Sequence, residues 1–364
     1  MREAAATPRA EIRVLIVDDS VVVREVLKNL LETDPDIRVI GMAADGGEAV
    51  ELTAQLRPDV VTMDLVMPGM DGLEATARIM AHYPTPVLFF SSYFDRDGMH
   101  SRFDALAAGA LDVVEKPTVM PNDQWTAQAG ALARKVKALA QVPVVAHIRG
   151  AHVQARLRPH PSRPGRLGAT SVDVVGIGVS SGGPRVLEEL LSSLPPALTL
   201  SVIIVQHMAE GFLGGLIEWL QQRCPVPMKV AEEGDLILPR RVLFAPDGKH
   251  LIVRPGGRVL LSDAAPVMGH RPSVDVTLTS LAKVYGARAA GMLLTGMGSD
   301  GAHGLLAIRH AGGVTMVQNE ESCVVFGMPR AAIEIGAAQR VLPTAGLIDS
   351  LKRLHADRVR SLAP

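Results

Sequence analysis

Short apolar runs alternate with segments of helical period along two long stretches of the chain, and this alternation constrains the fold more than any other feature. In the first stretch the apolar runs occupy residues 14–17, 39–42, 60–63, 87–90 and 113–114. Strands that alternate with helices pair in parallel, because each helix returns the chain to the same end of the sheet. We therefore expect a five-stranded, doubly wound parallel sheet that ends with a helix over residues 125–139.

The second stretch begins at residue 172 and repeats this alternation. Its apolar runs lie at residues 172–179, 200–206, 242–245, 251–254, 259–262, 290–295 and 313–317. They predict a second α/β domain with a mainly parallel sheet and one hairpin that turns at Pro255-Gly256-Gly257. An amphipathic segment at residues 347–362 is expected to pack on this domain as a helix.

Residues 141–170 separate the two stretches and follow neither period. They hold four prolines and five arginines but no acidic residue, a composition typical of a solvated linker. Contact of these arginines with an acidic surface is the alternative. The sequence thus predicts one domain over residues 12–140, a linker over 141–170 and a second domain over 171–354.

Charge and composition exclude several classes of protein. The formal net charge of −1 gives no overall attraction to nucleic acid or to an anionic membrane. Cys224 and Cys323 lie far apart and lack the spacing of zinc ligands. The N-terminal residues lack the apolar segment of a signal peptide, and no apolar run approaches the ~20 residues of a membrane span. We expect a cytoplasmic protein that binds no nucleic acid and does not insert into a membrane.

Three carboxylates follow strands of the first domain. Asp18 and Asp19 come directly after the first apolar run, and Asp64 comes directly after the third. Because the carboxyl ends of parallel strands meet at one edge of the sheet, these side chains should lie together. Clustered carboxylates repel one another unless a cation joins them, and an all-oxygen site suits Mg²⁺. Each acid taken alone also has a simpler interpretation as a helix cap.

Two further polar residues, Ser91 and Lys116, follow the fourth and fifth apolar runs. A lysine and a cation can together neutralise a phosphoryl group during its transfer to a carboxylate. Residues 12–130 closely resemble the receiver domain of two-component response regulators, through the motifs Val-Asp-Asp-Ser, Met-Asp-Leu-Val-Met-Pro-Gly-Met-Asp-Gly and Glu-Lys-Pro. Many receivers carry Tyr or Phe three residues before the lysine, where this chain has Val113, so an aromatic switch lacks its usual residue.

The resemblance to receivers assigns a role to each of these polar residues. It implies that Asp64 accepts a phosphoryl group and that Asp18, Asp19 and Asp64 hold Mg²⁺. It also implies that Lys116 contacts the phosphate and that Ser91 is the switch hydroxyl.

A glycine-rich turn follows the first apolar run of the second domain and reads Gly176-Ile-Gly-Val-Ser180-Ser-Gly-Gly183. It matches the nucleophile turn G-x-S-x-G, whose flanking glycines allow the sharp backbone that exposes a serine. A dinucleotide fingerprint would need a third glycine where Ser181 stands. On this motif alone, Ser180 is either a nucleophile or a helix cap.

A serine nucleophile needs a base and a group that orients the base. His207 ends the second apolar run of this domain, and Asp300 lies in the turn Leu-Leu-Thr-Gly-Met-Gly-Ser-Asp-Gly after a later run. Three strand ends thus supply Ser180, His207 and Asp300. Their order along the chain differs from the Ser, Asp, His order of α/β-hydrolases, which excludes that family but not the chemistry.

Five motifs of this domain together resemble the catalytic domain of the protein-glutamate methylesterase of bacterial chemotaxis. They are, in chain order, Ile-Gly-Val-Ser-Ser-Gly-Gly-Pro, Val-Gln-His-Met, His-Arg-Pro-Ser-Val-Asp, Leu-Thr-Gly-Met-Gly-Ser-Asp-Gly and Cys-Val-Val-Phe-Gly-Met-Pro-Arg. The resemblance implies that Ser180 attacks the methyl ester of a receptor glutamyl side chain, His207 relays the proton and Asp300 orients His207. It also implies glutamine deamidation, receptor helices as substrate and a chemotaxis-type histidine kinase as phosphodonor.

Acyl transfer places negative charge on the carbonyl oxygen, which backbone N–H groups must stabilise. The N–H groups of Ser181 and Met297 are our candidates, and we expect no cofactor for the esterase reaction. His270, Arg271 and Asp275 form an ionisable turn that is either catalytic or structural, and the structural interpretation is favoured.

Other classes of function remain as alternatives. Most proteins with a receiver bind DNA, but the second stretch lacks a helix-turn-helix pattern and a basic recognition helix. A silent interaction module would have no chemical need for the Ser, His and Asp set. A methylesterase-like regulator of a different signalling cluster is a further alternative. The sequence predicts a response regulator whose phosphorylation activates a methylesterase.

Overall fold

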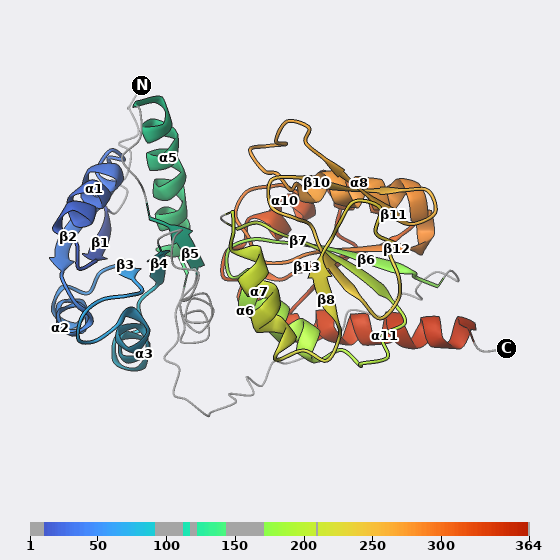
Figure 1. Cartoon of the computed structure of the whole chain (residues 1–364), viewed down its shortest axis with the longest axis horizontal. Helices are drawn as coiled ribbons and strands as arrows, with labels where there is room; N and C mark the ends of the chain where they lie inside the picture. The colour runs from blue at the N-terminus through green and yellow to red at the C-terminus, as the bar shows by residue number, and fades with distance from the viewer. Residues whose placement is uncertain (1–10, 92–111, 117–121, 143–170, 209, 363–364) are drawn as a thin grey trace, which may run out of the picture. The chain divides into compact units, whose positions relative to one another are not determined.

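The structure, a computed structural model, describes residues 11–91, 112–116, 122–142, 171–208 and 210–362. The chain divides into two compact units, Met1–Ala151 and His152–Pro364 (Figure 1). Most of the predicted linker, from residue 143 onward, lies outside the described residues, as does the apolar segment at residues 105–108.

The first unit contains a five-stranded sheet of strand order β2-β1-β3-β4-β5, in which all neighbouring strands are parallel. Its elements are β1 (Ile12–Val17), α1 (Val21–Leu31), β2 (Ile37–Ala43), α2 (Gly46–Leu56), β3 (Val60–Asp64), α3 (Gly72–His82), β4 (Val87–Ser91), β5 (Asp112–Glu115) and α5 (Asn122–Leu139). Helix α1 packs beside α5, and α2 packs beside α3. The predicted five-stranded parallel fold is confirmed.

Side chains at the sheet edge begin the helices of this unit. The first backbone N–H groups of a helix have no partner within that helix. In α1, α2 and α3 such groups donate to the side chains of Ser20, Asp45 and Asp71, respectively. At the other end, the Lys137 ammonium of α5 lies 2.6 Å from Asp34 and 2.7 Å from Asp36. The caps fix where the helices begin, and the Lys137 ion pairs join α5 to the connection between α1 and β2.

The second unit contains a seven-stranded sheet of order β14-β13-β12-β6-β7-β9-β8, again with every neighbouring pair parallel. Its strands are β6 (Val174–Val179), β7 (Ser201–Gln206), β8 (Met228–Val230), β9 (Val242–Phe244), β10 (His250–Arg254), β11 (Arg258–Ser262), β12 (Ala289–Leu293), β13 (Val314–Gln318) and β14 (Arg340–Leu342). Strands β10 and β11 form the predicted antiparallel hairpin, separate from the main sheet.

Helices pack in two groups around this sheet. They are α6 (Gly183–Ser192), α7 (Leu213–Gln221), α8 (Val274–Tyr285), α9 (Ala302–His310), α10 (Met328–Glu334) and α11 (Thr344–Leu362), with short 3-10 turns η1 (Gly286–Arg288) and η2 (Glu320–Ser322). Helix α8 packs beside α9 and α9 beside α10, while α11 packs beside α6. The predicted C-terminal amphipathic helix is confirmed, with Leu347, Leu351 and Leu354 buried.

Within the ranges that the structure describes, none of the helices combines the length and the apolar character needed to cross a membrane.

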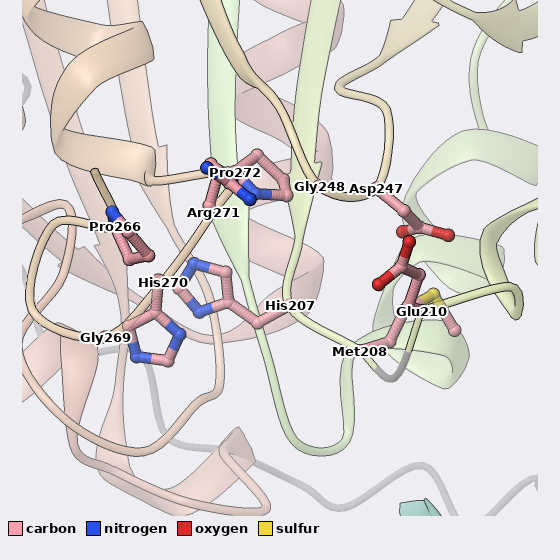
Figure 2. A pocket seen from close by; sticks show the side chains of 10 residues that line it. All are labelled: His207, Met208, Glu210, Asp247, Gly248, Pro266, Gly269, His270, Arg271 and Pro272. Carbon is pink, nitrogen blue, oxygen red and sulfur yellow. The ribbon is translucent and has the colours of Figure 1, made fainter. Parts of the chain in front are cut away.

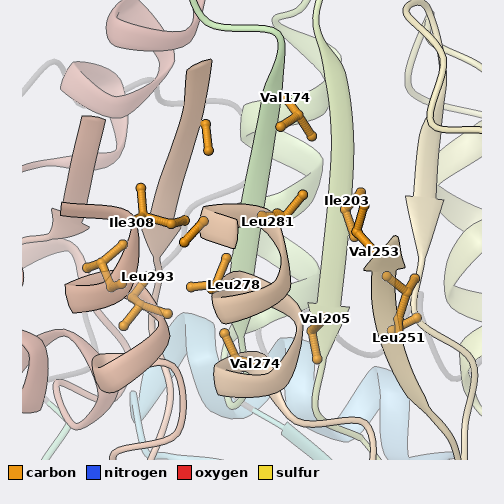
Figure 3. Close-up of a cluster of buried hydrophobic side chains, with 14 of the residues drawn as sticks. Val174, Ile203, Val205, Leu251, Val253, Val274, Leu278, Leu281, Leu293 and Ile308 are labelled. Atoms are coloured by element: carbon orange, nitrogen blue, oxygen red, sulfur yellow. The ribbon is translucent and has the colours of Figure 1, made fainter. Parts of the chain in front are cut away.

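Helix α8 lies over the centre of the second sheet and organises its hydrophobic core (Figure 3). Leu278 is 1% exposed and points from α8 toward β6. A Cβ atom on Gly176 of β6 would lie 2.4 Å from the Leu278 side chain, so the glycine allows the helix to approach the strand closely. This close packing positions the N-terminus of α8 at the edge of the sheet.

Replacing Leu278 with Ala should leave a cavity between α8 and β6. We expect the free energy of unfolding of the second unit to fall by about 2–5 kcal/mol in Leu278→Ala. The matched control is Lys283→Ala, on the exposed side of the same helix, with an expected change within about 0.5 kcal/mol. Urea unfolding measures both, and equal effects of the two substitutions would contradict the core position of Leu278.

Candidate functional site

Three acids and a lysine meet at the carboxyl edge of the first sheet. Asp18, Asp19 and Asp64 each place a carboxylate oxygen within 4.8 Å of the others. The Lys116 ammonium lies 2.8 Å from Asp18 Oδ2 and 2.6 Å from Asp64 Oδ2. Asp18 and Asp64 are buried, whereas Asp19 is exposed. Parallel pairing of β1 with β3 brings the three acids together, and the pairing of β3 with β4 and of β4 with β5 brings Lys116 to the same edge.

The chemistry of this donor set suits a divalent cation. Among the described residues, Asp18 Oδ2 is buried without a hydrogen bond of ordinary geometry, and the Lys116 ammonium lies beside it. Burial raises the pKa of Asp64, and Lys116 opposes that effect only in part. Burial also lowers the pKa of Lys116, but its contacts with Asp18 and Asp64 outweigh burial and leave this pKa raised. Lys116 thus remains charged, and the all-oxygen cluster fits Mg²⁺.

The two predicted switch positions are described only in part. Ser91 is the last residue of β4, next to β3, and Val113 pairs with Phe89 in the register of β4 and β5. The side chains of Ser91 and Val113 lie outside the described part of the structure, so their predicted roles stay predictions.

In the second unit, Ser180 and His207 follow neighbouring parallel strands. Val179 of β6 pairs with Gln206 of β7, so Ser180 and His207 are the next residues along the two strands. The His207 N–H donates to the Val179 carbonyl at 2.9 Å, which continues the pairing one step beyond the strands. Strands lie about 4.8 Å apart, so serine and histidine start from adjacent backbone positions.

Asp300 reaches His207 from the loop after β12, on the other side of β6. Its Oδ2 atom lies 2.9 Å from His207 Nε2. The direction of this approach lies outside that of a hydrogen bond, and among the described residues neither ring nitrogen of His207 has a hydrogen-bond partner. The structure therefore brings Asp300 to His207 but leaves the Ser180 hydroxyl without a hydrogen bond to the imidazole.

The N-terminus of α8 holds the Asp300 carboxylate in place. Asp300 accepts the Ser273 hydroxyl at 2.8 Å, the Val274 N–H at 2.8 Å and the Asp275 N–H at 3.0 Å. Burial raises the pKa of Asp300, but the contact with His207 and these N–H groups outweigh burial, so its pKa lies below the ordinary value. An ionised Asp300 at the positive end of a helix is a rigid anchor for an imidazole.

Asp275 connects α8 to α9. Its carboxylate, in the first turn of α8, accepts the Gly304 N–H of α9 at 2.6 Å. Burial raises the pKa of Asp275, and the Gly304 N–H opposes this effect. This contact supports the structural interpretation of Asp275, because its carboxylate joins the two helices whose ends form the site.

His270 stacks on His207 at the edge of a pocket (Figure 2). The two ring centroids lie 4.0 Å apart and the ring planes differ by 1°. Burial lowers the pKa of His270 to about 4, and the neighbouring His207 acts in the same direction. At neutral pH His270 is therefore an uncharged, flat surface against the imidazole of His207.

The pocket has a volume of about 280 Å³. It is lined by His207, Met208, Glu210, Asp247, Gly248, Pro266, Gly269, His270, Arg271 and Pro272. Figure 2 shows the two imidazoles at one side and the carboxylates of Glu210 and Asp247 at the other. Asp247 accepts the Gly211 N–H at 2.8 Å, and this bond holds the loop after His207.

Sequence reasoning missed the polar residues that support this arrangement. Thr295 accepts the Ser180 N–H at 3.0 Å through its carbonyl and donates its hydroxyl to the Ser181 carbonyl at 2.8 Å. Ser273 and Gln206 are also buried at the edge of the site. A polar residue at the end of an otherwise apolar run, as at Gln206 and Thr295, is the sequence signal that could have indicated these supporting residues.

The two candidate oxyanion donors also lie in this region. In the part of the chain that the structure describes, the Ser181 and Met297 N–H groups donate to no main-chain carbonyl. Gly296 lies against the nucleophile turn, because a Cβ atom there would be 2.7 Å from the Ser180 Cβ atom. These N–H groups are therefore available to another acceptor.

Each of the two units matches a known protein family. Residues 175–351 match the family of CheB methylesterases, and residues 14–123 match the response regulator receiver domain. A protein-glutamate methylesterase/protein-glutamine glutaminase of Syntrophus aciditrophicus is 42% identical over 97% of this chain and all of its own length. A protein of the same name from Myxococcus xanthus is 44% identical over 92% of each chain. The chain belongs to the CheB methylesterase family.

A crystal structure of the Thermotoga maritima CheB methylesterase catalytic domain is 36% identical and covers 51% of this chain and all of its own, with a TM-score of 0.49. Membership of the CheB methylesterase family confirms the predicted class, a hydrolase preceded by a receiver domain. The second unit is accordingly a methylesterase domain.

Replacing His270 with Phe keeps a flat ring against His207 but removes the titrating group. The pKa of His270 falls from 6.5 to about 4 on folding, so between these values the unfolded chain binds the extra proton. Wild-type stability should therefore decrease as the pH falls from about 6.5 to about 4. We expect a smaller loss of unfolding free energy in His270→Phe, measured by urea unfolding at pH values of about 7 and 4.5. Equal losses in the two proteins would contradict the buried, neutral state of His270.

Proposed function

We propose that the methylesterase domain hydrolyses methyl esters of glutamyl side chains on the cytoplasmic helices of chemoreceptors, and deamidates glutamines there, through Ser180, His207 and Asp300. Family membership supports the reaction class, since the curated relatives carry that name. The observation that carries the residue assignment is the 2.9 Å contact of His207 with Asp300, directly beside the Ser180 turn. We place the enzyme in the cytoplasm, where receptor helices and their kinase meet.

In the proposed reaction, Ser180 Oγ attacks the ester carbonyl carbon while His207 takes the hydroxyl proton. The tetrahedral intermediate collapses, and His207 returns the proton to the leaving methoxide, which departs as methanol. Water then attacks the acyl-enzyme by the same route and releases a glutamate side chain and free Ser180. The hydrogen bond from serine to histidine is absent in the resting structure, and such bonds often tighten only with substrate bound.

The chain itself supplies each group that this reaction needs, so we propose no cofactor for it. Asp300 orients the imidazole and stabilises the imidazolium, because α8 holds its carboxylate in the ionised form. The Ser181 and Met297 N–H groups are the proposed oxyanion donors. Such donors act most strongly when they are fixed before the charge develops, as backbone groups in a packed turn are.

Replacing Ser180 with Ala should remove the nucleophile. We expect methanol release from methylated receptor membranes to fall by about 10⁴-fold or more, the loss typical of serine hydrolases without their nucleophile. Ser192→Ala, on the exposed end of α6, is the matched control and should release methanol like the wild type. Methanol release by Ser180→Ala at the wild-type rate would disprove the mechanism.

For the receiver domain, we propose that Asp64 accepts a phosphoryl group from a chemotaxis-type histidine kinase and that phosphorylation raises the esterase rate. Asp18, Asp19 and Asp64 would hold the Mg²⁺, which offsets the negative charge of the transferring group. Lys116 binds the phosphate oxygens, and Ser91 is the proposed switch hydroxyl. Support comes from the carboxylate cluster and from the Lys116 contacts.

Replacing Asp64 with Asn should remove the phosphoacceptor. We expect a radiolabelled small phosphodonor with Mg²⁺ to label the wild type and Glu51→Gln, an exposed control on α2, but not Asp64→Asn. The phosphodonor should stimulate methanol release only in the proteins that become labelled. Labelling of Asp64→Asn to the wild-type extent would refute the assignment.

A further inference from the structure

The side chain of Gln206 connects the main chains of Ser180 and His207. Gln206 is the last residue of β7 and is 5% exposed. Its Nε2 atom donates one N–H to the Ser180 carbonyl at 3.0 Å and the other to the His207 carbonyl at 2.9 Å. Both donors of one amide are thus used on the two residues that the proposed reaction needs side by side.

The orientation of this amide follows from its surroundings. If the amide were reversed, its oxygen would face two carbonyl oxygens at these same distances, which is repulsive. The Oε1 atom instead points away from them and is buried, with no hydrogen-bond partner in the described structure. Leaving a buried amide oxygen unpaired is unfavourable, so the two N–H contacts must compensate for it.

Gly183 provides the space that the Gln206 amide occupies. A Cβ atom on Gly183 would lie 2.1 Å from Gln206 Oε1, far inside any permitted contact. The Gly183 N–H also donates to the Ser180 carbonyl at 2.8 Å, so the glycine and the amide meet at the same oxygen. The Gln206 amide therefore fits in this position because residue 183 has no side chain.

We propose that Gln206 is a positioning residue, which holds the backbone of the nucleophile and the backbone of the base at a fixed separation. This inference rests on the proposed function of Ser180 and His207. No direct hydrogen bond joins the two side chains in the resting enzyme, so their alignment depends on backbone contacts. A displacement of about 1 Å between reacting groups can lower a rate by about 10²-fold.

The first test removes the two donors and keeps the size of the side chain. We expect Gln206→Met to lower kcat for methanol release from methylated receptor membranes by about 10- to 100-fold, with KM changed less than about twofold. The rate at which a fluorophosphonate labels Ser180 should fall by a similar factor. A loss through general instability would instead lower the amount of folded enzyme and leave the labelling rate of the folded fraction unchanged. Wild-type kcat in a folded Gln206→Met protein would overturn the proposal.

The second test uses the contact between Gln206 and Gly183. In otherwise wild-type protein, Gly183→Ala should displace the amide and lower kcat/KM by about 10-fold or more. In a Gln206→Ala background the obstructing amide is gone and the close contact that remains is Val179 Cγ2, 2.8 Å from the added Cβ atom, so the same Gly183→Ala change should lower kcat/KM by a clearly smaller factor. Equal costs in the two backgrounds would show that Gly183 does not act through Gln206, and this comparison remains informative even if Gln206→Met fails to fold.

The Ser180→Ala variant distinguishes failure of the proposed reaction from failure of the proposed role of Gln206. If Ser180→Ala retains activity, the proposed reaction fails and the role of Gln206 fails with it. If Ser180→Ala is inactive but Gln206→Met has wild-type kcat, only the positioning role is wrong.

Discussion

Both sites of this chain depend on the parallel pairing of strands, which brings the carboxyl ends of neighbouring strands to one edge of a sheet. In the receiver domain, β1 and β3 deliver Asp18 and Asp64 to the same point. In the methylesterase domain, β6 and β7 end at Ser180 and His207, and the loop after β12 delivers Asp300. One rule of topology thus places the proposed phosphoacceptor in one domain and the proposed nucleophile in the other.

The second site also depends on α8, whose position follows from core packing. Leu278 fits against Gly176, and this contact sets how closely the helix approaches the sheet. The N–H groups at the start of α8 then reach Asp300, while Asp275 in the same turn reaches α9. A hydrophobic contact in the core is therefore connected to the charge state of an acid beside His207. The same helix, α8, thus contributes both to the hydrophobic core and to the position of Asp300.

Much of both sites could be predicted, because each principal residue follows an apolar run that is recognisable as a strand. Asp64, Ser180 and His207 all have this signal, and the structure places them at the sheet edges. The supporting residues Gln206 and Thr295 also end apolar runs, but that signal does not show what their side chains contact. Gln206 ends a strand as other buried polar residues do, and only the structure shows which carbonyls its amide reaches. Hydrogen-bond partners far apart in sequence depend on the packing of whole elements.

The sequence by itself determined the two α/β domains, the order of their strands along the chain and the residue types at the strand ends, because these depend on local apolar patterns. Only the tertiary structure decided which groups hold Asp300 in place, which amide joins the backbones of Ser180 and His207, and that His270 stacks on the imidazole. Those choices depend on distances of a few ångströms between distant segments, and core packing sets such distances where no local pattern can.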